Sequence, residues 1–553
     1  MTIPQRTIVV IGGAGGGPTA ASRAREFDED ARIVLVEKKP HVSWVQAGLR
    51  HHLEGRVQRL QQLDEDRREF FASRHRIELR TNTEAVRIDP DSQRVVLRTG
   101  GQGQEALRYD AVIFSGGAEV MPPPVAGLGG PRVTGFRTVD DLVAIQTAIQ
   151  QGAKRAVVVG CGPFGVDAAC GLRSAGLEVD VIERSDRILP AMSLLGARAA
   201  VLALARVGAR VHLQEDIAQS TPLGAGLRLS LKSGKSIDAD LVVLTSGLRP
   251  RTQLLAEAGA ALNSDGTVRV DAHMETTLPR VYACGTAISV THAVTRRPLW
   301  LPQAAVATRS AQIAGHNAAV DRPREALSPL AGTALYLVGE ERFARTGLSE
   351  SDARKALGDG NVIAVTIHGY AGEAWIGGDA MCVRLVVDRI AGVVVGGEVW
   401  GREGVPRRID LIAAAVVNGW SPARVTDLDM AYAPMLGPSF DPIQIAGQVA
   451  AKTLTGEANP VGAEALALRV LKGEVALLDV SRPGTAGTWP PGTLQIPLEA
   501  LREHLADLPR DKPLVVVSQT GQRGYLAWRI LKQRGFSASH LDGGALSYKL
   551  TQG

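Results

Sequence analysis

The stretch Thr7-Ile-Val-Val-Ile-Gly12-Gly-Ala-Gly-Gly-Gly17 decides the fold of the first part of the chain. Its apolar residues predict a buried strand, its glycines a tight turn, and residues 18–27 a helix that follows. A second apolar strand, residues 33–36, ends on the acid Glu37. This order is typical of a βαβ unit that binds a dinucleotide, because glycines let the backbone approach a pyrophosphate and the acid bonds ribose hydroxyls. Ala14 stands at the usual second glycine and is nearly as small.

The same pattern recurs further along the chain. Residues 155–159 predict a strand, Gly160-Cys-Gly-Pro-Phe-Gly165 opens a helix, and the strand at 177–182 is followed by Glu183. Two such units predict two dinucleotides bound by one chain. Glu183 would accept hydrogen bonds from an unphosphorylated ribose and repel a 2′-phosphate, which favours NAD(H) over NADP(H). Arg184 follows directly and weakens that preference.

Composition excludes several classes of protein. The 553 residues allow three or four domains at about 150 residues each. The net charge is only +5 and no block of like charges is present, which weighs against nucleic acid and anionic membranes as partners. We find no stretch of about 18 apolar residues and no signal peptide, so we expect neither a membrane span nor secretion.

Cysteine usage points to a reducing compartment. The chain has four cysteines, without a CxxC pair or the spacing of a metal site. We therefore predict a cytoplasmic location and no bound metal. The simplest prediction for Cys161, Cys170, Cys284 and Cys382 is that they are small buried hydrophobes.

Three further segments make the pair of dinucleotide motifs recognisable. Residues 110–118 end in Gly116-Gly117-Ala118, residues 241–250 contain Gly247, and residues 281–287 contain Gly285-Thr286. Together with the two glycine turns they resemble the pyridine nucleotide–disulfide oxidoreductase superfamily. In that superfamily the last segment carries an aspartate that bonds the ribityl chain of FAD, and here Thr286 takes its place.

The resemblance implies FAD in the first unit and NAD(H) in the second. The residues implied for FAD are Gly12, Ala14, Gly16, Gly17, Glu37, Lys38, Ser43, Gly116, Gly285 and Thr286. The residues implied for NAD are Gly160, Gly162, Pro163, Phe164, Gly165, Glu183 and Gly247. Pro163, Phe164 and their surroundings would stack the nicotinamide on the flavin.

The C-terminal half narrows the match. Residues 401–410, 431–434 and 441–442 are similar to the interface domain of coenzyme A-disulfide reductases, which forms a homodimer. Residues 476–525 resemble a single rhodanese domain. We therefore predict an α/β chain with two nested Rossmann-like domains, an α+β dimerisation domain and a rhodanese-like α/β tail, joined by a linker at about 456–464. The predicted boundaries are 1–118 with 247–322 for FAD, 119–246 for NAD(P), 328–456 for the interface and 464–553 for the tail.

Both cysteines of the family chemistry are missing. The loop from Ser43 aligns with the family loop, but Ala47 stands at the position of the redox cysteine, and Gln46 and Arg50 replace an asparagine and a proline. A methyl group forms neither a thiolate nor a mixed disulfide. In the rhodanese-like loop Ser518 replaces the cysteine. The anion-binding remainder of that loop is Gly521, Arg523 and Gly524.

The coenzyme A pocket and the interface tyrosines are also changed. Thr19 and Arg23 match residues of the pocket, but Glu26 stands where the family has a basic residue. The two tyrosine positions fall near 374–375 and at about Leu436. These losses predict that the protein no longer reduces coenzyme A disulfide or persulfide. A coenzyme A-like ligand remains an alternative.

A flavin needs no cysteine to accept a hydride. We therefore predict an FAD-dependent NAD(P)H oxidoreductase that passes electrons to oxygen, a quinone or another small acceptor. Gln46, His51 and His52 are the candidate catalytic residues, since a histidine near the flavin exchanges protons at neutral pH. The alternative for the two histidines is plain exposure at the start of the next helix. The alternatives for the protein are a non-catalytic nucleotide-binding scaffold, or non-redox chemistry on a thiol or acyl substrate.

Overall fold

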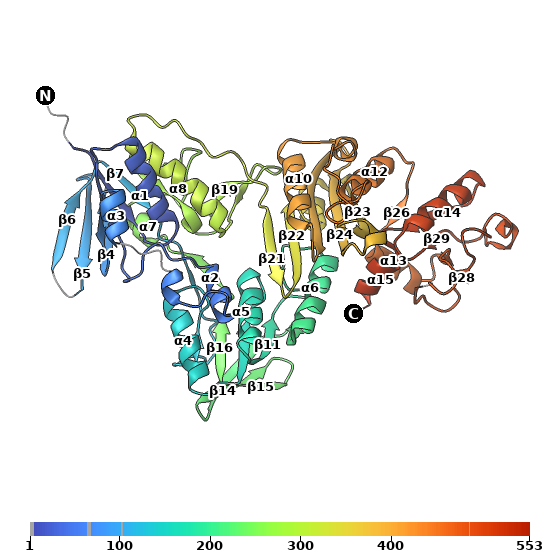
Figure 1. Ribbon diagram of the computed structural model, residues 1–553, viewed down its shortest axis with the longest axis horizontal. Helices are drawn as coiled ribbons and strands as arrows, with labels where there is room; N and C mark the ends of the chain where they lie inside the picture. Colours follow the sequence, from blue (N-terminus) through green and yellow to red (C-terminus); the bar gives the residue numbers. More distant parts are fainter. Residues whose placement is uncertain (1–4, 64–67, 101–102, 486, 553) are drawn as a thin grey trace. The chain divides into compact units, whose positions relative to one another are not determined.

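The computed structural model describes residues 5–63, 68–100, 103–485 and 487–552. Its contacts divide the chain into two compact units, and Figure 1 labels many of their elements. The first unit is Met1–Arg184, Gly208–His292 and Arg296–Leu330, and the second is Ser185–Val207, Ala293–Thr295 and Ala331–Gly553. Residues 185–207, predicted within the NAD(P) domain, thus belong to the second unit by contacts. The four predicted domain boundaries stay predictions.

A parallel sheet forms the core of the FAD part of the first unit. In spatial order its strands are β18 (Val281–Ala283), β7 (Ala111–Phe114), β1 (Thr7–Ile11), β2 (Arg32–Val36) and β3 (Ile77–Arg80). Val9 of β1 pairs with Val34 and Val112 on its two sides, and all three are fully buried. Strands buried on both faces read as continuous apolar runs, as residues 8–11 do.

Two helices pack together beside this sheet. They are α1 (Gly16–Phe27), which starts two residues before the predicted Pro18, and α8 (Ala304–Ala319). A Cβ added at Gly315 of α8 would lie 2.3 Å from the backbone oxygen of Ala20, so the helices approach closely. Smaller elements of this part are α2 (Gly48–Leu53), η1 (Leu60–Gln62), α3 (Arg68–Arg74), β4 (Thr83–Asp89), β5 (Arg94–Thr99), β6 (Gln104–Arg108), α7 (Gln253–Glu257), η2 (Gly285–Ala287), β19 (Val290–Thr291) and β20 (Pro298–Leu299).

A second parallel sheet holds the second glycine turn. In spatial order it contains β12 (Ala209–Leu213), β11 (Glu178–Glu183), β10 (Arg155–Val159), β16 (Leu241–Leu244) and β9 (Val133–Thr134). Its helices in the first unit are α4 (Val139–Gln150) and α5 (Pro163–Ser174), and an antiparallel sheet adds β13 (Ile217–Leu223), β14 (Gly226–Leu231) and β15 (Ser236–Ala239). The antiparallel pair β8 (Ala118–Val120) and β17 (Leu248–Pro250) carries the chain out of and back into the FAD part. The NAD(P) fold is therefore nested within the FAD fold.

An antiparallel sheet is the centre of the second unit. Its order is β21 (Ala334–Val338), β22 (Glu341–Gly347), β25 (Val393–Gly401), β24 (Ala380–Asp388) and β23 (Val362–Tyr370). The accompanying helices are α6 (Leu194–Val207), α9 (Glu350–Leu357), η3 (Asp359–Asn361), η4 (Ala374–Ile376), α10 (Val405–Val417), α11 (Pro422–Thr426) and α12 (Pro442–Leu454). Arg408 of α10 is fully buried and pairs with Asp441 at 2.6 Å. Asp441 also caps α12 by accepting from Ile443 N–H, so these two residues join the helices.

A parallel sheet completes the C-terminal tail within the same unit. Its order is β26 (Pro460–Val461), β30 (Ala538–Leu541), β29 (Leu514–Val517), β27 (Ala476–Asp479) and β28 (Leu494–Gln495), with α13 (Ala463–Leu471), η5 (Leu505–Asp507), α14 (Gln522–Gln533) and α15 (Gly544–Thr551). Part of the stretch predicted as a linker is a strand, β26. It forms because its backbone pairs with β30. Asp542 accepts a hydrogen bond from Thr366 N–H of β23, which ties the tail to the antiparallel sheet.

Candidate functional site

The first glycine turn is built for close backbone approach. Gly12 has φ +109°, and a Cβ there would lie 2.2 Å from Ser115 O. A Cβ at Gly17 would lie 1.7 Å from Gly12 O. Side chains are therefore excluded at both positions. Around Gly15, in contrast, the space within 4 Å of an added Cβ is empty, and Ala14 is exposed, so the turn is open on this side.

Glu37 faces that turn from the end of β2. Its carboxylate accepts hydrogen bonds from Gly13 N–H at 2.6 Å and Lys39 N–H at 2.8 Å. This is the position expected for an acid that bonds ribose hydroxyls. Lys38 beside it is exposed.

The second glycine turn repeats the geometry. Gly160 has φ +94°, and a Cβ at Gly165 would lie 2.1 Å from Gly160 O. Glu183 accepts a hydrogen bond from Cys161 N–H at 2.7 Å, as Glu37 does from Gly13. Gly162 has open space around it. The chain thus holds two turns of one design, each with an acid placed on its N–H groups.

The late segment of the FAD motif, residues 281–287, lies near the first turn, since a Cβ at Gly16 would lie 3.8 Å from Cys284 Sγ. Gly285 has φ +74° and donates its N–H to Ser310 Oγ at 3.0 Å. A Cβ at Gly117 would lie 3.7 Å from Thr286 Oγ1, so Thr286 and the Gly116-Gly117 segment come together as predicted residues of one site. Cys284 is fully buried, and burial raises the pKa of its thiol to about 12.

The loop from Ser43 to Ala47 lies against the first turn. Ser43 adopts φ +61° and donates its N–H to Gly13 O at 2.6 Å. Ala47 is exposed and forms the N-cap of α2. The Nε2 of Gln46 is buried and has no hydrogen-bond partner in the structure.

His51 and His52 lie in the last turn of α2, half-buried, and not at its start as the alternative expected. His51 Nδ1 lies 3.1 Å from Glu54 Oε2. His52 Nδ1 contacts Val57 O at 2.7 Å, and its Nε2 contacts Gln146 Nε2 of α4 at 2.9 Å. These contacts favour a role in holding α2 in place over one in proton transfer.

Two groups at the site were not expected from sequence. The Arg137 guanidinium lies 4.9 Å from the centre of the Phe164 ring, and its Nη1 is buried without a hydrogen-bond partner. Burial, and then the charge of Arg251, lower the pKa of Arg137 to about 10. Asp167 of α5 pairs with Arg50 of α2. Neither group is signalled by a motif, because each acts across a long sequence separation.

The residues predicted to bind coenzyme A, Thr19 and Arg23, contact other groups of the protein. Arg23 pairs with Glu26 at 2.5 Å and with Glu325 at 2.8 Å, and it stacks on the Phe27 ring at 4.5 Å. Thr19 Oγ1 donates to Gly15 O at 2.7 Å. The two carboxylates cancel the charge that would attract a phosphate.

The rhodanese-like loop has lost its exposed nucleophile position. Ser518 is 1% exposed, and its Oγ accepts a hydrogen bond from Gly524 N–H at 3.1 Å, at the start of α14. Arg523 donates to Val480 O and to Glu499, and Gly521 has φ +94°. The loop is therefore held by the Ser518 hydroxyl and by the contacts of Arg523 with Glu499 and with Val480, directly after β27.

Exposed apolar side chains gather in the interface part of the second unit. Trp375 and Met435 are 74% and 75% exposed, and Leu436, at the predicted tyrosine position, is 72% exposed. Glu373 N–H donates to Pro434 O, which brings the two segments together. An apolar surface of this kind is typical of protein–protein contact.

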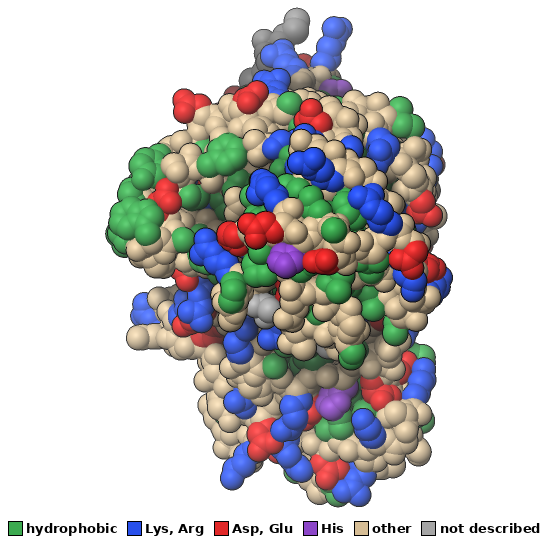
Figure 2. Space-filling view, turned by 90° about the vertical axis from the view of Figure 1, so that its right-hand side faces the viewer, with side chains coloured by type: hydrophobic (Ala, Val, Ile, Leu, Met, Phe, Trp, Pro, Cys, Tyr) green, Lys and Arg blue, Asp and Glu red, His purple; other side chains and the backbone are tan. Residues whose placement is uncertain are grey.

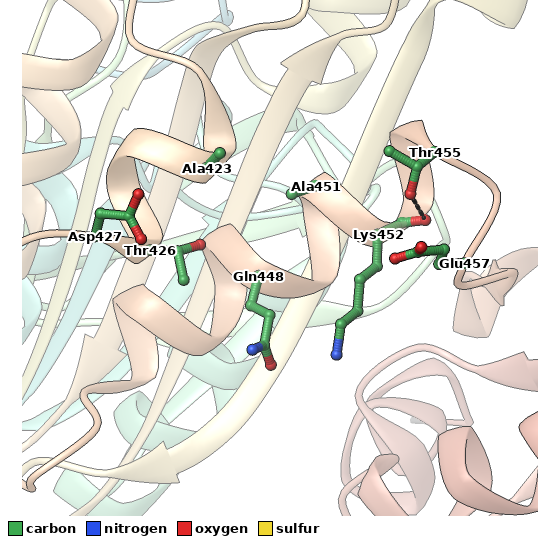
Figure 3. Close-up of a pocket in the computed structure, with 8 residues that line it drawn as sticks. All are labelled: Ala423, Thr426, Asp427, Gln448, Ala451, Lys452, Thr455 and Glu457. Atoms are coloured by element: carbon green, nitrogen blue, oxygen red, sulfur yellow. Dashed lines mark hydrogen bonds between the residues drawn. The ribbon is translucent and has the colours of Figure 1, made fainter.

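Two other parts of the surface differ in character: the face drawn in Figure 2 is mixed in charge, and a hollow beside α12 has a mainly polar lining. Lys and Arg side chains are interspersed with Asp and Glu on the face shown in Figure 2, so no single basic patch covers it. An open hollow of about 200 Å³ lies between α11 and α12, apart from both glycine turns in the chain. Figure 3 shows its small and polar lining, where Thr455 Oγ1 donates to Lys452 O at 3.2 Å.

The part of the chain that the structure describes contains neither a cluster of metal ligands nor a helix that could span a membrane. There, no three His, Cys, Asp or Glu side chains gather as metal ligands would. Within the same residues, every helix is too short or too polar to span a bilayer.

Comparison with known proteins gives three family matches along the chain. Residues 6–311 match the pyridine nucleotide-disulphide oxidoreductase model, residues 336–442 match the dimerisation domain of that group, and residues 463–551 match the rhodanese-like domain. A protein named NADH oxidase from Methanocaldococcus jannaschii is 26% identical, over 81% of this chain and 99% of its own length.

Two solved structures extend over nearly the whole chain. Reduced CoADR-RHD from Bacillus anthracis has a TM-score of 0.92 and 27% identity, covering 99% of this chain and 98% of its own. An NAD-dependent persulfide reductase from A. fulgidus has a TM-score of 0.92 and 29% identity, covering 98% and 100%.

Proposed function

The chain belongs to the pyridine nucleotide-disulphide oxidoreductase family, and from this premise we propose that it is an NADH-dependent flavoprotein whose electron acceptor is a small molecule other than a disulfide. As a member of this family, the protein is an FAD-dependent NAD(P)H oxidoreductase related to coenzyme A disulfide and persulfide reductases. The observation that carries the proposal is the combination of two nearly intact glycine turns with a missing flavin-side thiol.

The residues present fit FAD. Gly12 and Gly17 leave no room for a side chain, and Gly15 opens to free space, which is a cradle for a pyrophosphate. The buried, unpartnered Gln46 Nε2 and Arg137 Nη1 would gain partners from a bound cofactor. Bound FAD would supply a ring that accepts a hydride from NADH. Phe164 beside Arg137 would hold the nicotinamide against it.

The thiol chemistry of the family has no substitute in this chain. Ala47 and Ser518 stand at the two cysteine positions that the resemblance implies. All four cysteines are buried, and burial raises the pKa of Cys161, Cys284 and Cys382. A thiol needs its thiolate to attack a disulfide. Oxygen or a quinone therefore suits this site better than a disulfide.

Coenzyme A binding is reduced for an electrostatic reason. Arg23 would meet a phosphate only by leaving Glu26 and Glu325. Like charges on the ligand and on these carboxylates would repel. A coenzyme A-like ligand at Thr19 and Arg23 is thus the less favoured alternative.

The nicotinamide cofactor is proposed to be NADH. Glu183 lies at the ribose end of the second turn, where a 2′-phosphate would meet its carboxylate. Arg184, the next residue, is exposed, and its positive charge weakens the preference for NADH over NADPH. A homodimer through the Trp375 and Leu436 surface and a cytoplasmic location complete the proposal.

The first experiment is an anaerobic absorbance spectrum of the purified full-length protein, before and after NADH is added. A flavin band that NADH bleaches supports the proposal and directs the search to acceptors. Absence of flavin, even after incubation with FAD, would refute it. Thr286, in place of the family aspartate, would then favour the nucleotide-binding scaffold.

A further inference from the structure

A buried guanidinium joins helices α2 and α5. Arg50 is only 5% exposed, and its Nε lies 2.6 Å from Glu54 Oε1 on the same helix. Its Nη1 lies 3.1 Å from Asp167 Oδ1 on α5. Gly171 lets the helices approach, since a Cβ there would lie 3.2 Å from the Leu53 side chain. Figure 1 shows α2 beside α5.

The position of this ion pair relates it to both glycine turns. Arg50 is three residues after Ala47, and Asp167 is three residues after Phe164. On a helix, residues three apart share a face. The loop before α2 is hydrogen-bonded to Gly13 of the first turn, and α5 begins inside the second turn. The pair thus lies one helical turn behind the two residues that the proposed function sets against the flavin and the nicotinamide.

The two carboxylates that contact Arg50 differ in their other partners. Glu54 also contacts His51 and the exposed Arg56, so Arg50 is not the only basic side chain beside the Glu54 carboxylate. Asp167 has Arg50 as its ion-pair partner, and burial raises the pKa of its carboxyl. Arg50 and Asp167 are therefore opposite charges, held 3.1 Å apart in a partly desolvated place, where their fields are screened less than at a surface.

We propose that Arg50 and Asp167 are positioning residues for flavin reduction, with opposite electrostatic effects. This inference rests on the proposed function. With both cofactors bound, hydride transfer from NADH would bring two electrons and one proton to the flavin and leave NAD⁺. The positive charge of Arg50 favours the added electrons, whereas the carboxylate of Asp167 disfavours them and holds the Arg50 guanidinium in place. The ion pair would thus contribute to the flavin potential.

The test is the flavin midpoint potential of FAD-loaded full-length protein, measured by spectroscopic titration against a redox dye. Arg50→Met is expected to shift the equilibrium toward oxidised flavin by about tenfold, which is about 30 mV for a two-electron couple. Asp167→Asn is expected to shift it the opposite way, and Arg50→Lys to restore most of the potential. Arg56→Gln, at the exposed end of the same cluster, is the matched control and should leave it unchanged.

Opposite shifts are the signature that simple helix packing does not produce. Unchanged potentials in both variants, or shifts in one direction, would overturn the inference. Asp167 is 39% exposed, so Asp167→Asn is the variant least expected to disturb folding, and it decides the question even if Arg50→Met does not fold. Bleaching of the unaltered protein by NADH tests the proposed function separately.

Discussion

Two glycines of the second turn, three residues apart, provide a matched pair of substitutions. A Cβ at Gly165 would lie 2.1 Å from the backbone oxygen of Gly160, which has no flexible end to move. A Cβ at Gly162 meets nothing within 4 Å, and its φ of −74° suits any residue. Gly165→Ala should therefore distort the turn, whereas Gly162→Ala should leave the unliganded fold intact.

The magnitude follows from the contact. Overpacking against a rigid neighbour costs about 1–3 kcal/mol. If that strain is relieved by displacing the turn, NADH affinity falls by about 5- to 150-fold, since about 1.4 kcal/mol is tenfold. Gly162→Ala changes an N-cap glycine to alanine, which lowers the free energy of unfolding by no more than about 1 kcal/mol.

The assay combines urea unfolding with an anaerobic titration of flavin bleaching against NADH concentration. Gly165→Ala should retain FAD, because the first turn is unaltered, and should need more NADH. The argument from the added Cβ fails if Gly165→Ala matches Gly162→Ala in unfolding free energy and matches the unaltered protein in NADH requirement. The first turn offers the same contrast between Gly17→Ala and Gly15→Ala, with the free energy of unfolding of the FAD-free protein as the readout.

Three further predictions concern other parts of the chain. In chemical denaturation, Arg408→Met should lower the free energy of unfolding by about 3–5 kcal/mol, because it leaves the buried Asp441 carboxylate unpaired. The double variant Arg408→Met/Asp441→Leu should recover part of that loss. Glu26→Lys should raise coenzyme A affinity about tenfold by calorimetry, because it replaces one of the two carboxylates that pair with Arg23 by a positive charge, and an unchanged affinity would contradict the charge argument. Burial raises the pKa of Asp542 to about 6, above its value in an unfolded chain, so its contribution to stability is present at low pH and is lost as pH rises through 6. Asp542→Asn should therefore stabilise the protein above pH 6 and flatten the pH dependence of its melting temperature, whereas equal melting curves at pH 5 and pH 8 in both proteins would argue against this.

The local parts of the site could be predicted from sequence. Glycine spacing, apolar runs and the acids at the ends of the second strands depend on neighbours in the chain, and the structure places Glu37 and Glu183 on their turns. The start of α1 was misplaced by two residues, because glycines at Gly16 and Gly17 read as turn although they are already helical. The linker prediction missed β26 for a related reason, since only pairing with β30 makes that segment a strand.

Sequence alone determined that two dinucleotide turns are present, in which order, and that Ala47 and Ser518 cannot act as thiols. Tertiary structure decided which charges meet. Arg50 finds Asp167 and Arg408 finds Asp441 across long stretches of chain, and His51 and His52 turn to Glu54 and Gln146. Turn formation is governed by φ, ψ and sterics within a few residues, whereas an ion pair depends on how whole helices pack. For this reason the cofactor turns are visible in the sequence and the charges that act on them are not.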